Sequence, residues 1–133
     1  RGSAYQLTLE VAPNPALWQL STHELWPALL VDLAADTPIG LIAARFHVAL
    51  AAGLAQLCAR VFERERSCRP VARQVALSGG CLQNAVLHEC LERELQNHAL
   101  EALTHAAIPT NDGGIALGQA LVTLARVAEE TVR

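Results

Sequence analysis

The first part of the chain alternates apolar and polar side chains in two short runs, YQLTLEV at 5–11 and LWQLS at 17–21. This alternation predicts two strands, and APNP at 12–15 predicts the turn between them. An apolar pattern with a helical period follows over 23–35. Ser21 or Thr22 is the expected N-cap of that helix.

A second and longer helical pattern begins at Thr37-Pro38, a capping hydroxyl followed by a proline suited to the first helical position. It runs to about Arg66. Its most apolar part, 39–55, is shorter than the roughly 20 apolar residues of a membrane-spanning helix, so we expect a buried helix of a soluble protein and no membrane contact. On a helical wheel one narrow stripe is expected to meet water: Arg45, Ala49, Ala52, Gln56 and Arg60.

The second half of the chain predicts strands over 73–77 and 100–104, each followed by a helix, at 81–96 and about 114–129. Asn97 is the expected left-handed residue that ends the first of these helices. The last helix has one polar stripe, formed by Gln119, Thr123 and Arg126, so it should be mostly covered. The order of elements predicts an α/β fold, a small sheet that is at least partly parallel and is covered by helices.

Composition supports one compact domain and excludes some classes of function. Of 133 residues, 52% are apolar and 17% charged, and the net charge of -3 with few aromatic residues argues against a nucleic-acid groove. The cysteines at 58, 68, 81 and 90 form no CxxC motif, which argues against a structural zinc site. The sequence shows no secretory signal, so we expect reduced thiols in a cytoplasmic protein, with Cys58 and Cys90 in the core. Residues 1–3 look like a cloning remnant, which leaves 4–133 as the domain.

Paired glycines mark both strand-to-helix turns, Gly79-Gly80 and Gly113-Gly114. Ligands bind at the carboxyl ends of strands in open α/β sheets, where glycine lets the backbone approach them closely. Helix N-termini there favour anions. Neither turn has the lysine of a P-loop or the GxGxxG spacing, so the pattern indicates half of a nucleotide or anion site.

Three polar side chains near these turns, Gln83, Asn84 and Asp112, have two possible roles each. On the wheel of helix 81–96, Gln83 and Asn84 fall within the apolar arc, where they would bond either the neighbouring loop or a ligand. Asp112, in TNDGG, would either cap the next helix or bind a metal. His47 would be a satisfied core histidine by default. The apolar arc itself is expected to hold Leu82, Val86, Leu87, Cys90, Leu91 and Leu95.

Three segments of the chain form a specific combination: IAARFHVALAAGLA at 42–55, VALSGGCLQN at 75–84 and PTNDGGIALGQA at 109–120. Together they resemble the HypF carbamoyltransferase family of [NiFe]-hydrogenase maturation. The resemblance covers about 37–126 and matches the C-terminal part of a Kae1-like domain, half of an actin/Hsp70-like (ASKHA) fold. A more distant similarity is to the Kae1/TsaD threonylcarbamoyl-transferase group.

The resemblance implies an ATP-dependent enzyme that takes carbamoyl phosphate, forms a carbamoyl adenylate and passes the carbamoyl group to the C-terminal cysteine of HypE. By position it implies nucleotide contacts from Ser78, Gly79, Gly80, Asn84, Gly113 and Gly114. It also implies that Asp112 joins a histidine pair in holding a divalent metal.

That histidine pair belongs upstream of this chain in the family, as do an acylphosphatase-like domain, zinc-finger motifs and a YrdC-like domain. We therefore expect a C-terminal lobe that is inactive by itself and has the upstream domains of the same polypeptide and HypE as partners. Some positions depart from the family pattern, such as Cys81-Leu82 and Thr110. A non-catalytic docking or scaffold lobe is the alternative.

Overall fold

The computed structural model of the chain describes residues 5–12, 17–66 and 72–131. Residues 1–3 and most of the turn predicted at 12–15 lie outside the described residues. The elements are β1 (Thr8–Val11), β2 (Trp18–Ser21), α1 (Leu25–Ala34), α2 (Ile39–Arg66), β3 (Gln74–Ala76), the 3-10 turn η1 (Gly80–Gln83), α3 (Ala85–Asn97), β4 (Glu101–Leu103), the 3-10 turn η2 (Asp112–Gly114) and α4 (Ile115–Thr131). This order confirms the predicted mixture of strands and helices.

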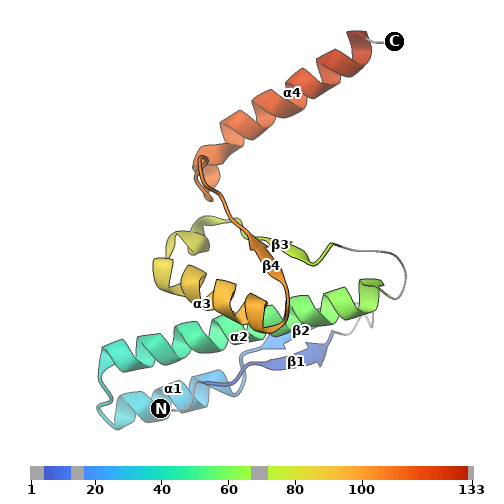
Figure 1. Ribbon diagram of the computed structural model, residues 1–133. Coiled ribbons are helices and arrows are strands. Elements are labelled where there is room, and N and C mark those ends of the chain that lie inside the picture. Colours follow the sequence, from blue (N-terminus) through green and yellow to red (C-terminus); the bar gives the residue numbers. More distant parts are fainter. Residues whose placement is uncertain (1–4, 13–16, 67–71, 132–133) are drawn as a thin grey trace.

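The described strands form two separate pairs instead of one sheet. β1 and β2 pair antiparallel, with Thr8 opposite Ser21 and Val11 opposite Trp18. β3 and β4 pair parallel, from Gln74 opposite Glu101 to Ala76 opposite Leu103, which confirms the predicted parallel pairing. In Figure 1 the parallel pair, α3, α2 and the hairpin follow one another from top to bottom, so the two pairs lie on opposite sides of α2.

The helix α2 is the centre of the fold because small residues allow close packing on it. A Cβ placed on Gly53 would lie 3.2 Å from Leu7 Cβ, so this glycine lets the N-terminal segment approach the helix backbone. The water-facing stripe predicted for α2 is partly wrong, since Ala49 is buried at 3% exposure. Arg45, in the same stripe, forms an ion pair with Asp32 of α1. The N-terminal segment and α1 therefore cover a face that the wheel assigned to solvent.

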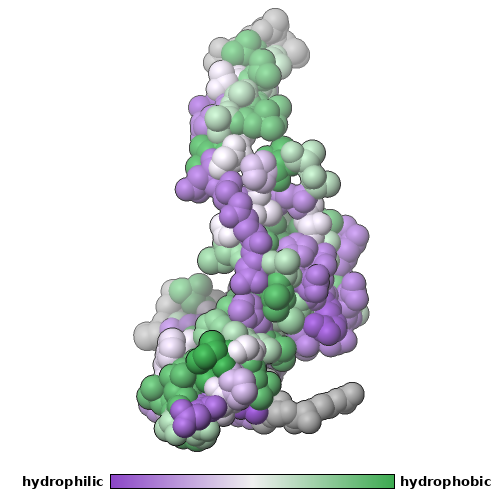
Figure 2. Space-filling view, turned by 90° about the vertical axis from the view of Figure 1, so that its left-hand side faces the viewer, coloured by the Kyte–Doolittle hydropathy of each residue, from purple (hydrophilic) through white to green (hydrophobic). Residues whose placement is uncertain are grey.

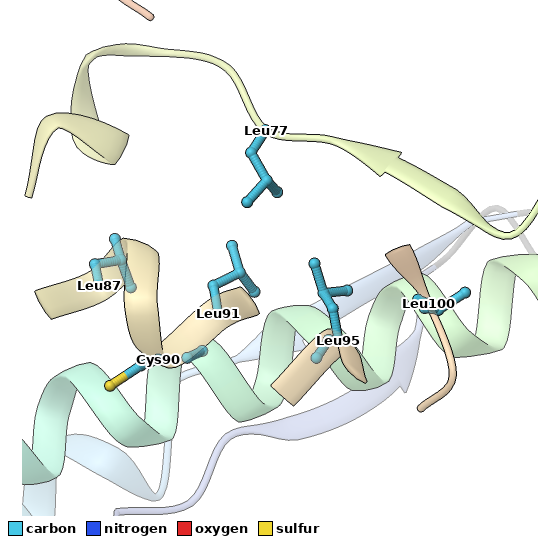
Figure 3. Packing of buried hydrophobic residues seen from close by; sticks show 8 residues of the cluster. Leu77, Leu87, Cys90, Leu91, Leu95 and Leu100 are labelled. Atoms are coloured by element: carbon cyan, nitrogen blue, oxygen red, sulfur yellow. The ribbon is translucent and has the colours of Figure 1, made fainter. Parts of the chain in front are cut away.

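The larger core cluster lies between α2, α3 and the parallel strands (Figure 3). Its buried members are Ala51, Ala55, Leu77, Leu87, Cys90, Leu91, Leu95 and Leu100. Leu77 points from the end of β3 toward α3, while the leucines of α3 occupy the space between β3 and α2. Cys90 is a core residue as predicted, and Cys58 is half-buried against the cluster, where burial raises the pKa of its thiol.

A smaller cluster joins the N-terminal segment to α1 and α2 through Tyr5, Leu25, Ile42 and Ala49. At its edge, the Tyr5 hydroxyl donates to Asp32 Oδ2 at 2.6 Å, and the Arg45 guanidinium donates to the same oxygen. Thr37, the cap predicted for α2, donates its hydroxyl to Asp32 Oδ1 at 3.4 Å. Asp32 of α1 thus connects this helix to Tyr5 near the N-terminus, to Thr37 before α2 and to Arg45 within α2.

By length and composition α2 could cross a membrane, since one 18-residue window has a mean hydropathy of 1.6. The prediction that the apolar segment is too short for this is therefore wrong. Long core helices of globular proteins have the same composition, and α2 contributes Ala51 and Ala55 to the larger cluster and Ile42 and Ala49 to the smaller one. We describe it as a core helix for that reason.

Two helix ends differ from the predictions. The N-cap residue of α1 is Glu24, which makes no side-chain capping bond, whereas the Thr22 hydroxyl accepts from Trp26 Nε1 at 3.1 Å. The left-handed residue after α3 is Ala99, with φ of 54°, because α3 continues through Asn97. Its N–H donates to Gln96 O at 2.9 Å, which closes the turn into β4.

The prediction that the last helix is mostly covered is wrong for this chain. α4 projects away from the remaining elements in Figure 1, and its described side chains are exposed. Its large apolar residues include Ile115, Leu117, Leu121, Val122, Leu124 and Val127, all between 46% and 66% exposed. In Figure 2 this upper projection carries a continuous hydrophobic surface. No described part of the chain packs along it.

Candidate functional site

The parallel pairing of β3 and β4 brings the two glycine turns together. The carboxyl ends of both strands point to the same edge, and one turn follows each strand. The Gly79 N–H donates to the Thr110 carbonyl at 2.7 Å. A Cβ on Gly80 would lie 4.0 Å from Asn111 Cβ. The turns therefore form one continuous surface, as expected for a ligand edge of parallel strands.

The first turn needs glycine at one position because of its backbone. Gly79 has φ of 107° and ψ of 155°, a region that side-chain-bearing residues rarely adopt. The chain then enters η1, where the Leu82 N–H donates to Gly79 O at 3.1 Å. Within the described residues no hydrogen bond is formed by the N–H groups of Gly80 and Cys81 or by the Ser78 hydroxyl. These groups remain available to a ligand.

Asn84 begins α3 as its N-cap residue, which corrects the predicted helix 81–96. Its Oδ1 accepts from the Leu87 N–H at 3.1 Å, and its backbone is extended, as at most N-caps. Since η1 interrupts the helix, the wheel drawn through 81–96 does not apply, and both Gln83 and Asn84 are exposed. Val86, assigned to the apolar arc, is also 53% exposed.

The amide of Asn84 contacts a histidine from another helix, which the sequence patterns did not reveal. Asn84 Nδ2 lies 2.8 Å from His47 Nε2 on α2, and His47 Nδ1 lies 2.7 Å from the Ala43 carbonyl. His47 is therefore satisfied at both nitrogens, but it is half-buried beside the turn and is not enclosed in the core. The preference of asparagine for N-cap positions was the sequence signal that could have located the start of α3.

The second turn is capped by Asn111 and not by Asp112. Asn111 Oδ1 accepts from the Gly113 N–H at 2.9 Å, and its carbonyl accepts from the Gly114 N–H at 3.1 Å. A Cβ on Gly113 would lie 3.0 Å from Asn111 Oδ1, and one on Gly114 would lie 3.2 Å from Pro109 O. A side chain at either position would therefore force the neighbouring atoms of the turn to shift.

Asp112 is left with an exposed carboxylate that forms no hydrogen bond or ion pair within the described residues. Those residues include no group of three or more His, Cys, Asp or Glu side chains that could hold a metal ion. Asp112 can serve as one ligand, but metals such as Mg²⁺ and Zn²⁺ need further donors. The described part of the chain does not fit a complete metal site.

The turn residues form an open wall. Ser78, Gly79, Gly80, Asn84, Asp112 and Gly113 are exposed, and Gly114 is half-buried. Two cavities of about 420 and 580 Å³ lie elsewhere, one beside Asp32 and Arg45 and the other beside Arg73 and Glu101. A ligand on the turns would therefore leave one side uncovered by the described residues.

Comparison with known proteins identifies the family of the chain that carries these turns. The family described as "Carbamoyltransferase, Kae1-like Domain, second subdomain" matches residues 2–119. Carbamoyltransferase HypF of Rhizobium leguminosarum bv. viciae is 42% identical over 99 residues, which are 74% of this chain and 12% of that protein. Carbamoyltransferase HypF2 of Cupriavidus necator is 37% identical over 122 residues, 90% of this chain and 14% of that protein.

A third relative, carbamoyltransferase HypF of Rhodobacter capsulatus, is 39% identical over 102 residues, 76% of this chain and 13% of that protein. No solved structure matches the chain. The chain spans only 12% to 14% of the length of these relatives. By the match over 2–119 and these identities, the chain belongs to the HypF carbamoyltransferase family, as a second subdomain of the Kae1-like domain.

Proposed function

We propose that this chain is the nucleotide-facing lobe of an ATP-dependent carbamoyltransferase. The complete enzyme would take carbamoyl phosphate and ATP, form a carbamoyl adenylate and transfer the carbamoyl group to the C-terminal cysteine of HypE. The observation that carries the proposal is the contact between the two glycine turns, because the Gly79 N–H donates to Thr110 O at 2.7 Å. Family membership supplies the reaction class.

In this proposal ATP lies along the wall formed by both turns. The free N–H groups of Gly80 and Cys81 would donate to phosphate or ribose oxygens, and the lack of side chains at Gly79 and Gly80 would allow that approach. Asn84 and the Ser78 hydroxyl would add side-chain contacts. Gly113 and Gly114 would keep the second turn tight beneath the ligand, since a Cβ on either would meet atoms within 3.2 Å.

Asp112 would provide one ligand to a divalent metal, with the other donors coming from outside the described residues. Its carboxylate is exposed and unpaired on the wall, which supports this role. The metal would neutralise phosphate charge. Asp112 alone cannot hold a metal ion, because the described residues form no group of three or more possible ligands around it. The lobe by itself should therefore be inactive.

We further propose that the lobe is half of an ASKHA-type domain in a cytoplasmic enzyme. The upstream domains of the same polypeptide would close the open side of the wall and cover α4. Reduced thiols fit this compartment, since the described cysteines 58, 81 and 90 are free. The alternative of a docking lobe is favoured by one observation, the uncovered apolar surface of α4.

The test replaces Asn84 and Asp112 separately by alanine in the complete enzyme. Both variants should lose most ATP-dependent carbamoyl transfer, measured as labelled carbamoyl on the HypE cysteine. Asp112→Ala should keep the thermal midpoint of the wild type, whereas Asn84→Ala should lower it by the equivalent of about 1 kcal/mol, because the N-cap bond to Leu87 is lost. Asn97→Ala and Asp36→Asn are matched controls, because both residues are exposed and lie away from the glycine turns, and asparagine tolerates the positive φ of position 36. Normal transfer by both site variants would reject the nucleotide wall and leave the docking lobe.

A further inference from the structure

The hydrogen bonds around His47 fix the state of its ring. The Ala43 carbonyl can only accept, so His47 Nδ1, at 2.7 Å from it, carries the proton. The Leu87 N–H can only donate, so Asn84 Oδ1 faces it at 3.1 Å and Asn84 Nδ2 faces His47. An amide nitrogen only donates, so His47 Nε2 must offer its lone pair. The network therefore requires the neutral ring with the proton on Nδ1.

This ring state in turn fixes the side chain of Asn84. One amide hydrogen goes to His47 Nε2, and one lone pair of Oδ1 accepts from Leu87 N–H. The second amide hydrogen and the second lone pair remain free, on a residue that is exposed beside the glycine turn. The side chain thus presents one donor and one acceptor in a fixed orientation. Without His47 only the cap bond would hold it.

We propose that His47 is a positioning residue, which holds the Asn84 amide in the orientation that contacts the nucleotide. The inference rests on the proposed function, since it takes Asn84 as a nucleotide contact. His47 itself would not touch the ligand, because both of its nitrogens are already bonded. It is anchored on α2, the central core helix, so the amide is tied to the rigid part of the fold.

The test compares substitutions that differ in one hydrogen-bond acceptor, made in the complete enzyme. His47→Leu removes the acceptor and should raise the KM for ATP about threefold to tenfold, the range expected for one lost hydrogen bond. His47→Gln places an amide oxygen as many bonds from the backbone as Nε2, and should restore the KM to within about twofold of wild type. The KM for carbamoyl phosphate should stay unchanged in both.

His88→Leu is the matched control, because His88 lies on α3 and contacts Glu92 at 3.7 Å on its polar side. It should leave the KM for ATP unchanged. If His47→Leu does not yield folded protein, His47→Met replaces it, since methionine fills the space without a nitrogen acceptor. Thermal midpoints of all variants report the fold separately.

A double-mutant cycle distinguishes positioning from general stabilisation. If His47 acts through Asn84, then His47→Leu combined with Asn84→Ala should have the same KM for ATP as Asn84→Ala alone. Additive effects, or a wild-type KM in His47→Leu while Asn84→Ala raises it, would overturn this inference and leave the proposed function intact. A wild-type KM in Asn84→Ala would instead overturn the nucleotide contact on which both rest.

Discussion

The Gly79 N–H donates to the Thr110 carbonyl oxygen at 2.7 Å and thereby joins two turns that are far apart in the sequence. Gly79 can make this bond only because its φ of 107° turns the chain at the end of β3. Nothing lies within 4 Å of a Cβ built at this position. The requirement for glycine is therefore conformational and not a matter of space.

Gly79→Ala should accordingly destabilise the protein by about 1–3 kcal/mol through backbone strain. Urea unfolding followed by circular dichroism measures this change. Gly118→Ala is the matched control, because a Cβ at Gly118 in α4 also meets nothing within 4 Å. Alanine there should stabilise the helix by about 0.5–1 kcal/mol. Equal stability of Gly79→Ala and wild type would contradict the strained turn.

The acid stability of the fold should depend on Asp32. The hydrogen bond from Arg45 and then that from Tyr5 hold the pKa of Asp32 below its usual value. A group with a lower pKa in the folded state stabilises the fold above its unfolded pKa, about 3.9, and this contribution is lost as the pH falls through the folded value. Asp32→Asn should be less stable than wild type at pH 7, and the difference should shrink below about pH 4.

Unfolding curves recorded between pH 3 and pH 7 would check this. Asp36→Asn is a suitable control, since Asp36 is exposed and has a positive φ of 53°, which asparagine adopts readily. A difference between Asp32→Asn and wild type that stays constant over the whole range would show that ionisation of Asp32 does not contribute.

Local patterns were sufficient to predict much of this fold and the meeting of the two turns. Alternation located β1 and β2, and Thr37-Pro38 located the start of α2. Parallel strands β3 and β4 place both following turns at one edge, so the hydrogen bond between Gly79 and Thr110 was a consequence of topology. These features depend on short-range periodicity and on one general rule of sheet geometry.

Other features could not be predicted, for two physical reasons. A wheel assumes an uninterrupted helix, whereas the 3-10 turn ends at Gln83 and α3 begins after Asn84, so Gln83 is not on the helix and lies at the surface. Val86 is on α3 itself, at the edge of its apolar arc, and its side chain is 53% exposed. Burial is also a tertiary property. The apolar composition of α4 indicates that the helix needs a partner but not that the partner is within this chain. His47 and Asn84 meet only because α2 and α3 pack together.

The difference in burial between Leu95 and Val86 of α3 predicts unequal costs for two truncations that the wheel treated alike. Leu95 is fully buried in the larger core cluster, so Leu95→Ala should destabilise the protein by about 2–5 kcal/mol. Val86→Ala should change stability by no more than about 0.5 kcal/mol in this chain, because Val86 is half exposed. Chemical unfolding of both variants provides the measurement. Similar losses in both variants would show that Val86 is packed as closely as Leu95.

The exposed face of α4 should become buried in a full-length HypF polypeptide that carries this lobe. Leu124 is 66% exposed here, so Leu124→Glu should change the stability of the chain itself by no more than about 0.5 kcal/mol. In the full-length polypeptide the same change should cost more than about 2 kcal/mol, because a leucine contact is lost and a charge is buried. Thermal unfolding of both forms compares the two costs.

Thr123→Glu is the control for this pair, since Thr123 lies on the polar stripe of the same helix and donates its hydroxyl to Gln119 O at 2.9 Å. It should have little effect in either form. Trypsin cleavage after Arg126 gives an independent readout: the exposed bond should be cut rapidly in the chain alone and slowly in the full-length polypeptide. If Leu124→Glu is harmless and cleavage equally fast in both, α4 is not the surface that joins this lobe to its upstream domains.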